Sequence, residues 1–378
     1  MPSARVRRHL LTLAAALLVA ACQGTAPAPD RSPAPAVTRP FTAALPHAAA
    51  IEAYLARLAS SGRLDGSVLV ARGAATFTAA YGWADRTART KDTVGTAYRL
   101  GSVTKQFTAM AVLILAQRHR LSLTDRVCTY LANCPGDWAA ITLDELLTHT
   151  SGIPDYLNEL GYPWPPRDVD PAGLIGEFRD APLTAPPGTR MRYSNSGYAL
   201  LGYVIERVTG KPYAEALEQL IFRPLGMTHT GVDMTAIRPG HAVGYYADGS
   251  RADGYPMSAF YSAGAVYSTV ADIQIWDAAL DGDVLLPDGA MRDLLRVHVP
   301  CPPARSPGGC VVRGDVGYGY GWFVARTPEG TLDYHVGHID GFLTVNADYR
   351  AGRMHVVVLS NDESTDVVGI MRTLAGMA

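Results

Sequence analysis

An α+β fold is predicted, in which strands from both ends of the chain form an antiparallel sheet flanked by helices, with a mostly helical insertion between them. Short apolar or alternating segments lie near both ends, whereas helical patterns and Pro/Gly-rich loops dominate residues 102–260. The 378 residues are 48% hydrophobic. This is enough to bury a large core in one domain or in two intimate subdomains.

The first elements follow in order. Residues 49–63 are predicted to form an amphipathic helix. Residues 67–71 and 76–81 read as two short strands, joined by a Gly-Ala-Ala turn. A strand pair near the N-terminus can then join strands from the C-terminal part.

Residues 102–117 are predicted to form a buried helix, because they are apolar almost all round, and residues 197–208 a helix that stops at Gly210. Residues 331–336, 342–349 and 354–360 are predicted to form a meander of three strands, with a turn at 350–352. A short helix at 365–374 closes the chain.

The N-terminus has the features of an export signal. Arg5, Arg7 and Arg8 precede an apolar stretch at 10–21, which is shorter than the ~20 residues of a membrane span. Val19-Ala20-Ala21-Cys22 resembles a bacterial lipobox, which implies acylation of Cys22; the alternative is an ordinary secretory signal. Gln23 follows, a pattern resembling outer-membrane lipoproteins.

The expected organisation is therefore a signal peptide at 1–21, a Pro/Ala-rich tether at 22–48 and a catalytic domain at 49–378. We expect the domain to be lipid-anchored at the periplasmic face of the outer membrane, and to touch the membrane only through that anchor.

Four further cysteines lie in the folded part. Export permits disulfides, and four cysteines allow three connectivities. Local pairs, Cys128–Cys134 and Cys301–Cys310, are favoured over free buried thiols because each brackets a loop-like stretch.

Composition excludes several classes of protein. The formal charge is −2 and 18% of residues are charged, so there is no basic footprint for nucleic acid. Disorder, collagen and coiled coil are also excluded. Lysine is rare in this arginine-rich chain, being found only at Lys91, Lys105 and Lys211.

The strongest chemical signal is Ser102-Val103-Thr104-Lys105, the only Ser-x-x-Lys in the chain, at the start of the buried helix. A hydroxyl and an amine three residues apart share one helix face. A desolvated lysine can lose its proton and act as a base toward the serine, which an arginine cannot do. The alternative is a capping serine beside a snorkelling lysine.

Two further elements carry polar groups. Tyr193-Ser194-Asn195 precedes a helix, and Tyr193 and Asn195 point the same way if the segment is extended. The alternative is a packed tyrosine beside a capping asparagine. His335-Val336-Gly337-His338 ends a predicted strand, where Gly337 permits close approach to the backbone. Alternatives are a turn histidine, or a metal site of His335, His338 and Asp340.

Together and in this order, these elements resemble the serine β-lactamase and penicillin-binding superfamily, whose signatures are S-x-x-K, S-D-N or Y-x-N, and K-T-G. Tyr193-Ser194-Asn195 looks like the branch of class C β-lactamases, DD-carboxypeptidases and esterases. His335-Val336-Gly337 stands where that family has Lys-Thr-Gly or His-x-Gly. The resemblance spans about 49–378 and includes the blocks 146–152, 224–227, 318–322 and 359–361.

The resemblance implies that Ser102 forms an acyl-enzyme, that Lys105 and Tyr193 share the acid–base work, and that Asn195 positions Lys105 and substrate. It also implies that His335 binds substrate and that the N–H groups of Ser102 and His338 form the oxyanion hole. No metal or organic cofactor is implied, and we expect a monomer. His149 reads as a loop-holding residue, while Tyr320 or Trp322 could line the acyl pocket.

Three activities fit these residues: hydrolysis of D-amino-acid peptides of the cell wall (DD-carboxypeptidase-like), of small esters, or of β-lactams. A mostly neutral imidazole at His335 suits a substrate carboxylate less than a lysine does. The tether favours a peptide substrate such as peptidoglycan. A non-catalytic penicillin or cell-wall receptor is the alternative from another class. A classical Ser-His-Asp hydrolase is disfavoured, since the chain has no Gly-x-Ser-x-Gly.

Overall fold

The computed structural model describes residues 43–378 except 163–166, 235–239, 253–255 and 303–313. The predicted signal peptide, Cys22 and most of the tether lie outside these residues. Within the described ranges, no helix has both the length and the apolar character needed to cross a bilayer.

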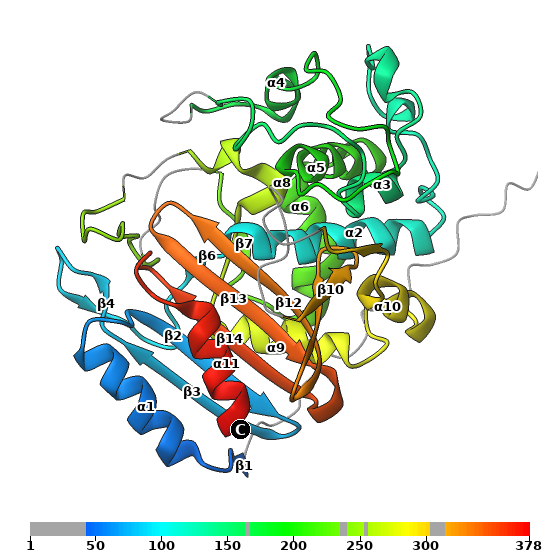
Figure 1. Ribbon diagram of the computed structural model, residues 1–378. Coiled ribbons are helices and arrows are strands. Elements are labelled where there is room, and N and C mark those ends of the chain that lie inside the picture. Colours follow the sequence, from blue (N-terminus) through cyan, green and yellow to red (C-terminus); the bar gives the residue numbers. More distant parts are fainter. Residues whose placement is uncertain (1–42, 163–166, 235–239, 253–255, 303–313) are drawn as a thin grey trace, which may run out of the picture. The chain divides into compact units, whose positions relative to one another are not determined.

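One sheet of nine strands forms the centre of the fold, in the order β1-β3-β2-β14-β13-β12-β11-β10-β9 (Figure 1). The pair β1–β3 is parallel and every other pair is antiparallel. The N-terminal hairpin thus joins the C-terminal meander through β2 and β14, as the predicted α+β fold requires. The strands are β1 (Ala43–Ala44), β2 (Gly66–Arg72), β3 (Ala75–Tyr81), β9 (Val299–Pro300), β10 (Asp315–Tyr318), β11 (Phe323–Thr327), β12 (Gly330–Ile339), β13 (Phe342–Tyr349) and β14 (Met354–Ser360).

Helices cover both faces of this sheet. On one face α1 (Ala48–Ser60) and α11 (Val367–Met377) pack against Val68 and Val70. On the other, Leu69 and Ala71 join the core of the helical region. This explains why β2 is apolar at consecutive positions, since a strand covered on both sides has no solvent face.

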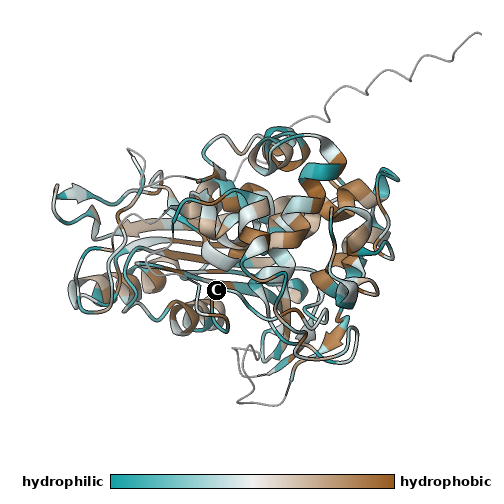
Figure 2. Ribbon diagram, turned by 90° about the horizontal axis from the view of Figure 1, so that it is seen from above, coloured by the Kyte–Doolittle hydropathy of each residue, from teal (hydrophilic) through white to brown (hydrophobic). Residues whose placement is uncertain are grey.

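The helix predicted at 102–117 is the 3₁₀ turn η1 (Gly101–Val103) followed by α2 (Thr104–Gln117), and every residue from Thr104 to Leu115 is buried. It packs against α5 (Asn195–Thr209), which ends at Gly210 in the left-handed conformation (φ 71°), as its sequence predicts. Figure 2 shows many apolar residues, drawn in brown, on the helices of the layer beside the sheet. The buried polar start of α2 therefore lies between helices and sheet.

Several elements of the insertion were not predicted. They include a small sheet, β6-β8-β7, and helices beyond residue 260. In α9 the buried face includes Asp272 and Asp277, which interrupts the apolar period that would reveal a helix. These elements are α3 (Leu143–Leu147), α4 (Pro171–Gly176), α6 (Tyr213–Leu217), α7 (Arg223–Leu225), α8 (Tyr261–Gly264), α9 (Val270–Leu280), α10 (Asp288–Leu295), β6 (Tyr98–Arg99), β7 (Gly231–Val232) and β8 (Val266–Ser268), with the lone pair β4 (Trp83–Asp85) and β5 (Thr90–Lys91) at the periphery.

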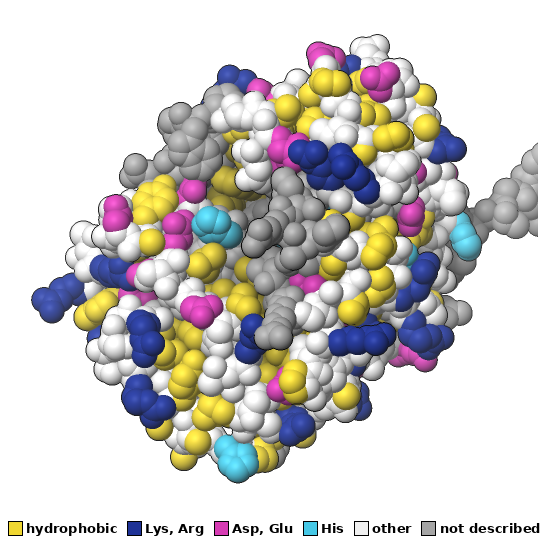
Figure 3. Space-filling view, in the orientation of Figure 1, with side chains coloured by type: hydrophobic (Ala, Val, Ile, Leu, Met, Phe, Trp, Pro, Cys, Tyr) yellow, Lys and Arg dark blue, Asp and Glu magenta, His cyan; other side chains and the backbone are white. Residues whose placement is uncertain are grey.

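The disulfide predicted between Cys128 and Cys134 is present, with Cα atoms 5.3 Å apart. Cys301 is also disulfide-bonded, but Cys310 lies outside the described residues, so the 301–310 pairing stays a prediction. Figure 3 shows basic and acidic side chains interspersed over one face of the protein, in keeping with the small net charge.

Candidate active site

Ser102 and Lys105 lie one turn apart where η1 passes into α2. The Lys105 Nζ donates to the Ser102 Oγ at 3.0 Å, the geometry that the Ser-x-x-Lys spacing predicts. Ser102 lines a cavity of about 400 Å³, whereas Lys105 is fully buried beneath it. The hydroxyl is therefore open to a ligand and its amine neighbour is closed to bulk water.

The environment of Lys105 is polar but holds no direct carboxylate contact. Besides Ser102, its Nζ donates to the Asn195 Oδ1 at 2.8 Å and to the Ala263 carbonyl of α8 at 2.9 Å. Burial lowers the pKa of Lys105 to about 7, and the charge of Asp155 offsets only part of that effect. A substantial share of the lysine is then neutral near pH 7.

Asp155 is a site residue that the sequence analysis missed. It is buried, and both its carboxylate oxygens accept from the Asn195 Nδ2, at 3.2 and 3.0 Å. The Asn158 amide donates to the same carboxylate at 2.7 Å. Asp155 thus fixes which way the Asn195 amide points, so that its oxygen faces Lys105. Its position directly after the block 146–152 was the available signal.

Tyr193 lies over the amine of Lys105, whose Nζ is 4.8 Å from the centre of the phenol ring. Burial raises the pKa of Tyr193 well above its usual value, and the Ser102 hydroxyl offsets only part of that rise. Among the described residues, no atom completes a hydrogen bond to the Tyr193 hydroxyl. Tyr193 is therefore a neutral phenol whose proton is available to a ligand.

His149 holds this tyrosine in place. Its Nδ1 accepts from the Ser194 backbone N–H at 3.1 Å, and its ring packs 4.3 Å from the ring of Tyr193. Burial keeps the pKa of His149 well below the usual value, so the ring is neutral. The prediction of a loop-holding histidine agrees with these contacts.

The third motif lies wholly within β12, which runs three residues beyond the predicted strand. A methyl group on Gly337 would overlap the carbonyl oxygen of Leu100, so glycine lets β12 pass directly beside η1. A methyl group on Gly101 would lie 2.9 Å from the backbone N of His338. The backbone of His338 therefore lies next to the turn that carries Ser102.

The two histidines of β12 have different surroundings. The His335 Nδ1–H donates to the Val336 carbonyl at 2.7 Å, which leaves the Nε2 to accept from the Tyr318 hydroxyl at 3.3 Å. Burial and the neighbouring Lys105 lower the pKa of His335 to about 3, so it carries no charge near neutral pH. The His338 ring is exposed and contacts Glu363 instead.

His335 is buried and His338 is exposed, and the two rings have different partners. Within the described residues, no group of three or more His, Cys, Asp or Glu side chains is arranged to hold a metal ion.

The cavity is lined by both polar and apolar side chains. The polar ones include Ser102, Tyr193, Asn195 and His335. Tyr320 and Trp322 are buried and do not line it, contrary to the expectation for the acyl pocket. The apolar lining includes Leu157, Phe260, Phe323 and Ile339.

Comparison with known proteins identifies the family. The sequence profile of the beta-lactamase family matches residues 47–375. A putative penicillin-binding protein of Bacillus subtilis, PbpX, is 30% identical over 323 residues, 84% of this chain and 75% of that protein.

Two solved structures are also similar. The D-amino acid amidase of Ochrobactrum anthropi SV3 has 26% identity and a TM-score of 0.76, over 87% of this chain and 96% of that one. The D-stereospecific amidohydrolase of Streptomyces has 27% identity and a TM-score of 0.74, over 88% and 98%. The chain belongs to the beta-lactamase family and is a serine hydrolase of the acyl-enzyme type.

Proposed function

We propose that this enzyme hydrolyses D-amino-acid peptides or amides, and small esters, through an acyl-enzyme on Ser102. The observation that supports this most directly is the contact of the Ser102 hydroxyl with a fully buried lysine amine at 3.0 Å. The two similar structures named above are hydrolases of D-amino-acid derivatives by their titles.

The proposed first step is attack on the substrate carbonyl. The neutral amine of Lys105 takes the proton from the Ser102 Oγ, which forms a bond to the carbonyl carbon. The backbone N–H groups of Ser102 and His338 stabilise the resulting oxyanion. The tetrahedral intermediate then collapses and the bond to the leaving amine or alcohol breaks.

The second proton transfer is assigned to Tyr193. Its phenol faces the cavity side of Ser102 and stays protonated, so it can donate to the leaving group and recover the proton from Lys105. A water molecule then attacks the acyl-enzyme by the same steps in reverse. Lysine and tyrosine act as one coupled unit, and the lysine begins the cycle because it is the group that is deprotonated near neutral pH.

The neutral state of His335 bears on substrate choice. A β-lactam, and a peptide with a free C-terminus, each present a carboxylate, which a cationic side chain binds best. His335 is uncharged at neutral pH, and none of the described residues lining the cavity is a lysine or an arginine. This supports amides and esters over β-lactams and over substrates of the DD-carboxypeptidase type.

A comparison of stereoisomers tests the proposed function. The p-nitroanilide of D-alanine should be hydrolysed at least ~10-fold faster, in kcat/KM, than that of L-alanine, because a rigid cavity aligns only one isomer with Ser102. Initial rates at 405 nm measure both. Equal rates for the two isomers would contradict D-selectivity, and the absence of any amide or ester turnover would contradict the hydrolase itself.

We also propose that the enzyme is exported and held at the periplasmic face of the outer membrane by a lipid on Cys22. The support is the sequence pattern at 5–22 and the Pro/Ala-rich tether. In membrane fractionation, the full chain should be found in the membrane pellet, whereas Cys22→Ser should be found in the soluble fraction. Retention of Cys22→Ser in the pellet would contradict lipid anchoring.

A further inference from the structure

Asp340 adds a carboxylate to the lining of the cavity. It occupies the two-residue turn Asp340-Gly341 that joins β12 to β13, where Ile339 pairs with Phe342. It lines the same cavity as Ser102 and His335, two residues after His338. A short turn of this kind holds the carboxylate close to the end of the strand.

The Oδ2 of Asp340 is buried and has no hydrogen-bond partner among the described residues. His338 and Arg99 are near enough to influence the carboxylate. The ring of His338, however, contacts Glu363, and the guanidinium of Arg99 donates to the Asp233 Oδ2 at 3.2 and 3.3 Å. A half-buried carboxylate without a partner is costly, and it is expected where a ligand supplies the partner.

A second carboxylate adds to the negative potential. The Glu363 Oε1 accepts from the Gly341 N–H at 2.8 Å and contacts the Nε2 of His338 at 3.2 Å. Burial and the charge of Glu363 raise the pKa of Asp340 to about 6. Above that pH the Asp340 carboxylate is ionised, and its negative charge in the cavity attracts cations.

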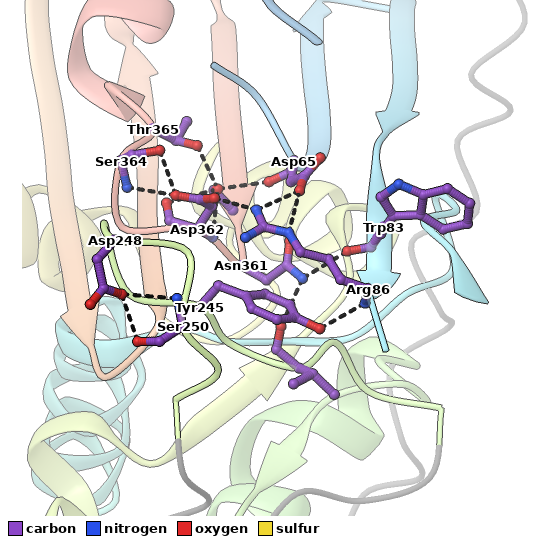
Figure 4. A network of polar contacts seen from close by, with 12 residues as sticks. Asp65, Trp83, Arg86, Tyr245, Asp248, Ser250, Asn361, Asp362, Ser364 and Thr365 are labelled. Carbon is purple, nitrogen blue, oxygen red and sulfur yellow. Dashed lines mark hydrogen bonds and ion pairs between the residues drawn. The ribbon is translucent and has the colours of Figure 1, made fainter. Parts of the chain in front are cut away.

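The segments that carry these two carboxylates are hydrogen-bonded to Tyr245, which belongs to the polar network of Figure 4. Arg86 bridges Asp65 and Asp362, and its backbone N–H donates to the Tyr245 hydroxyl at 2.7 Å. The backbone N–H of Tyr245 donates to the Gly341 carbonyl at 3.2 Å, and the carbonyl of Tyr245 accepts from the Glu363 N–H at 3.0 Å. The network therefore fixes the β12–β13 turn and the segment after β14 relative to each other.

We infer that Asp340 is a specificity-determining residue that binds an ammonium group of the substrate. The enzyme then selects amino-acid amides, peptides or esters whose free amino group lies next to the reacting carbonyl. This inference rests on the proposed function, because it names the substrate class of the same site. The carboxylate of Asp340 accepts charge-assisted hydrogen bonds from the ammonium while Ser102 attacks the carbonyl.

The test compares D-alanine p-nitroanilide with its N-acetyl derivative at pH 7, where an α-amine is largely protonated. For the wild type, kcat/KM should be about 10- to 100-fold higher for the free amine, the range expected for a hydrogen bond between charged groups. Asp340→Asn should remove that preference, mainly by raising KM for the free amine. Asp340→Glu keeps the charge and should retain part of the preference.

Glu329→Gln is the matched control. Glu329 is exposed and precedes β12 at the end opposite to Asp340, about 30 Å away along a ten-residue strand. Glu329→Gln removes one negative charge, as Asp340→Asn does, but leaves the cavity unchanged. The preference for the free amine should therefore be the same as in the wild type. An equal loss in Glu329→Gln would show that net charge, not Asp340, is responsible, and would overturn the inference.

The pH dependence of the wild type provides a reading that needs no variant. The amine-to-acetyl ratio should fall as pH drops from 7 to 5, because Asp340 becomes protonated while the substrate amine stays charged. Turnover of both substrates with equal kcat/KM overturns the inference and leaves the proposed hydrolase intact. Turnover of neither anilide overturns the inference. If esters are not hydrolysed either, or if turnover survives Ser102→Ala, the proposed function is overturned as well.

Discussion

Ser102→Ala will lower turnover of amide and ester substrates by about 10⁴-fold or more, the loss typical of removing a serine nucleophile. Ser102 is the hydroxyl that both lines the cavity and contacts the Lys105 amine. Alanine leaves the cavity and the lysine in place but offers no atom to accept the acyl group. The measurement is kcat/KM on a p-nitrophenyl ester, with the melting temperature of both proteins as a check on folding.

Ser194→Ala is the matched control for this variant. The Ser194 hydroxyl is buried beside Tyr193 and Asn195 but has no hydrogen-bond partner among the described residues. Its removal should therefore change kcat/KM by no more than a few fold. Turnover in Ser102→Ala comparable to that of Ser194→Ala would rule out Ser102 as the nucleophile.

Intact mass gives an independent reading of the same prediction. A fluorescent penicillin that acylates the wild type should leave no adduct on Ser102→Ala. A stable adduct on the wild type alone would identify the nucleophile and reveal slow deacylation. An adduct on both proteins would place the reactive group elsewhere in the chain.

Lys105→Arg will lower kcat/KM by about 10³-fold or more, although it keeps the positive charge. An arginine remains protonated at any working pH and cannot take the proton of Ser102. Its larger head must also fit a site where Lys105 is fully buried and donates three hydrogen bonds. The assay is the ester hydrolysis used for Ser102→Ala, with circular dichroism to verify the fold.

Lys211→Arg makes the same chemical change at a surface position. The Lys211 ammonium is exposed and pairs with Glu215 along one helix turn. Activity and melting temperature should both stay close to those of the wild type. Near-full activity in Lys105→Arg would eliminate the lysine as general base and assign that role to Tyr193.

The pH dependence of the wild type follows from the same lysine. Burial lowers the pKa of Lys105 to about 7, so the amine is protonated below that pH and free above it. For an uncharged ester, kcat/KM should rise as pH increases from 6 to 8 and then level off. His335, with a pKa near 3, stays neutral throughout this range and adds no second step. A flat profile between pH 6 and 8 would contradict a lysine base of this pKa.

Local patterns were sufficient for much of the fold and for the catalytic pair. The all-apolar run around Phe107 predicts a buried helix, and Ser102 and Lys105 share a face because three residues span about one turn. The meander at 331–360 was predicted from its apolar strands and its turn, and β12, β13 and β14 pair as expected. Each of these features depends on residues close together in the sequence.

The residues missed at the site depend on contacts between distant segments. Asp155 reaches the site through Asn195, 40 residues further along the chain. From the sequence, Asp340 is considered only as a metal ligand. It lines the cavity because β12 packs against η1 in the folded chain. Phe260 and Phe323 come from separate regions of the chain to line the same cavity, for which no local pattern exists.

The order of the motifs can be read directly along the chain. The helix that carries Ser102 and Lys105, and their shared face, follow from backbone periodicity. The protonation states of the site depend instead on the folded surroundings. The pKa of Lys105 falls to about 7 and that of His335 to about 3 because α5, α8 and the sheet exclude water from both groups. Desolvation depends on everything that surrounds a group in space. Lys105 therefore becomes a candidate base, and His335 an uncharged ring at neutral pH, only when the chain is folded.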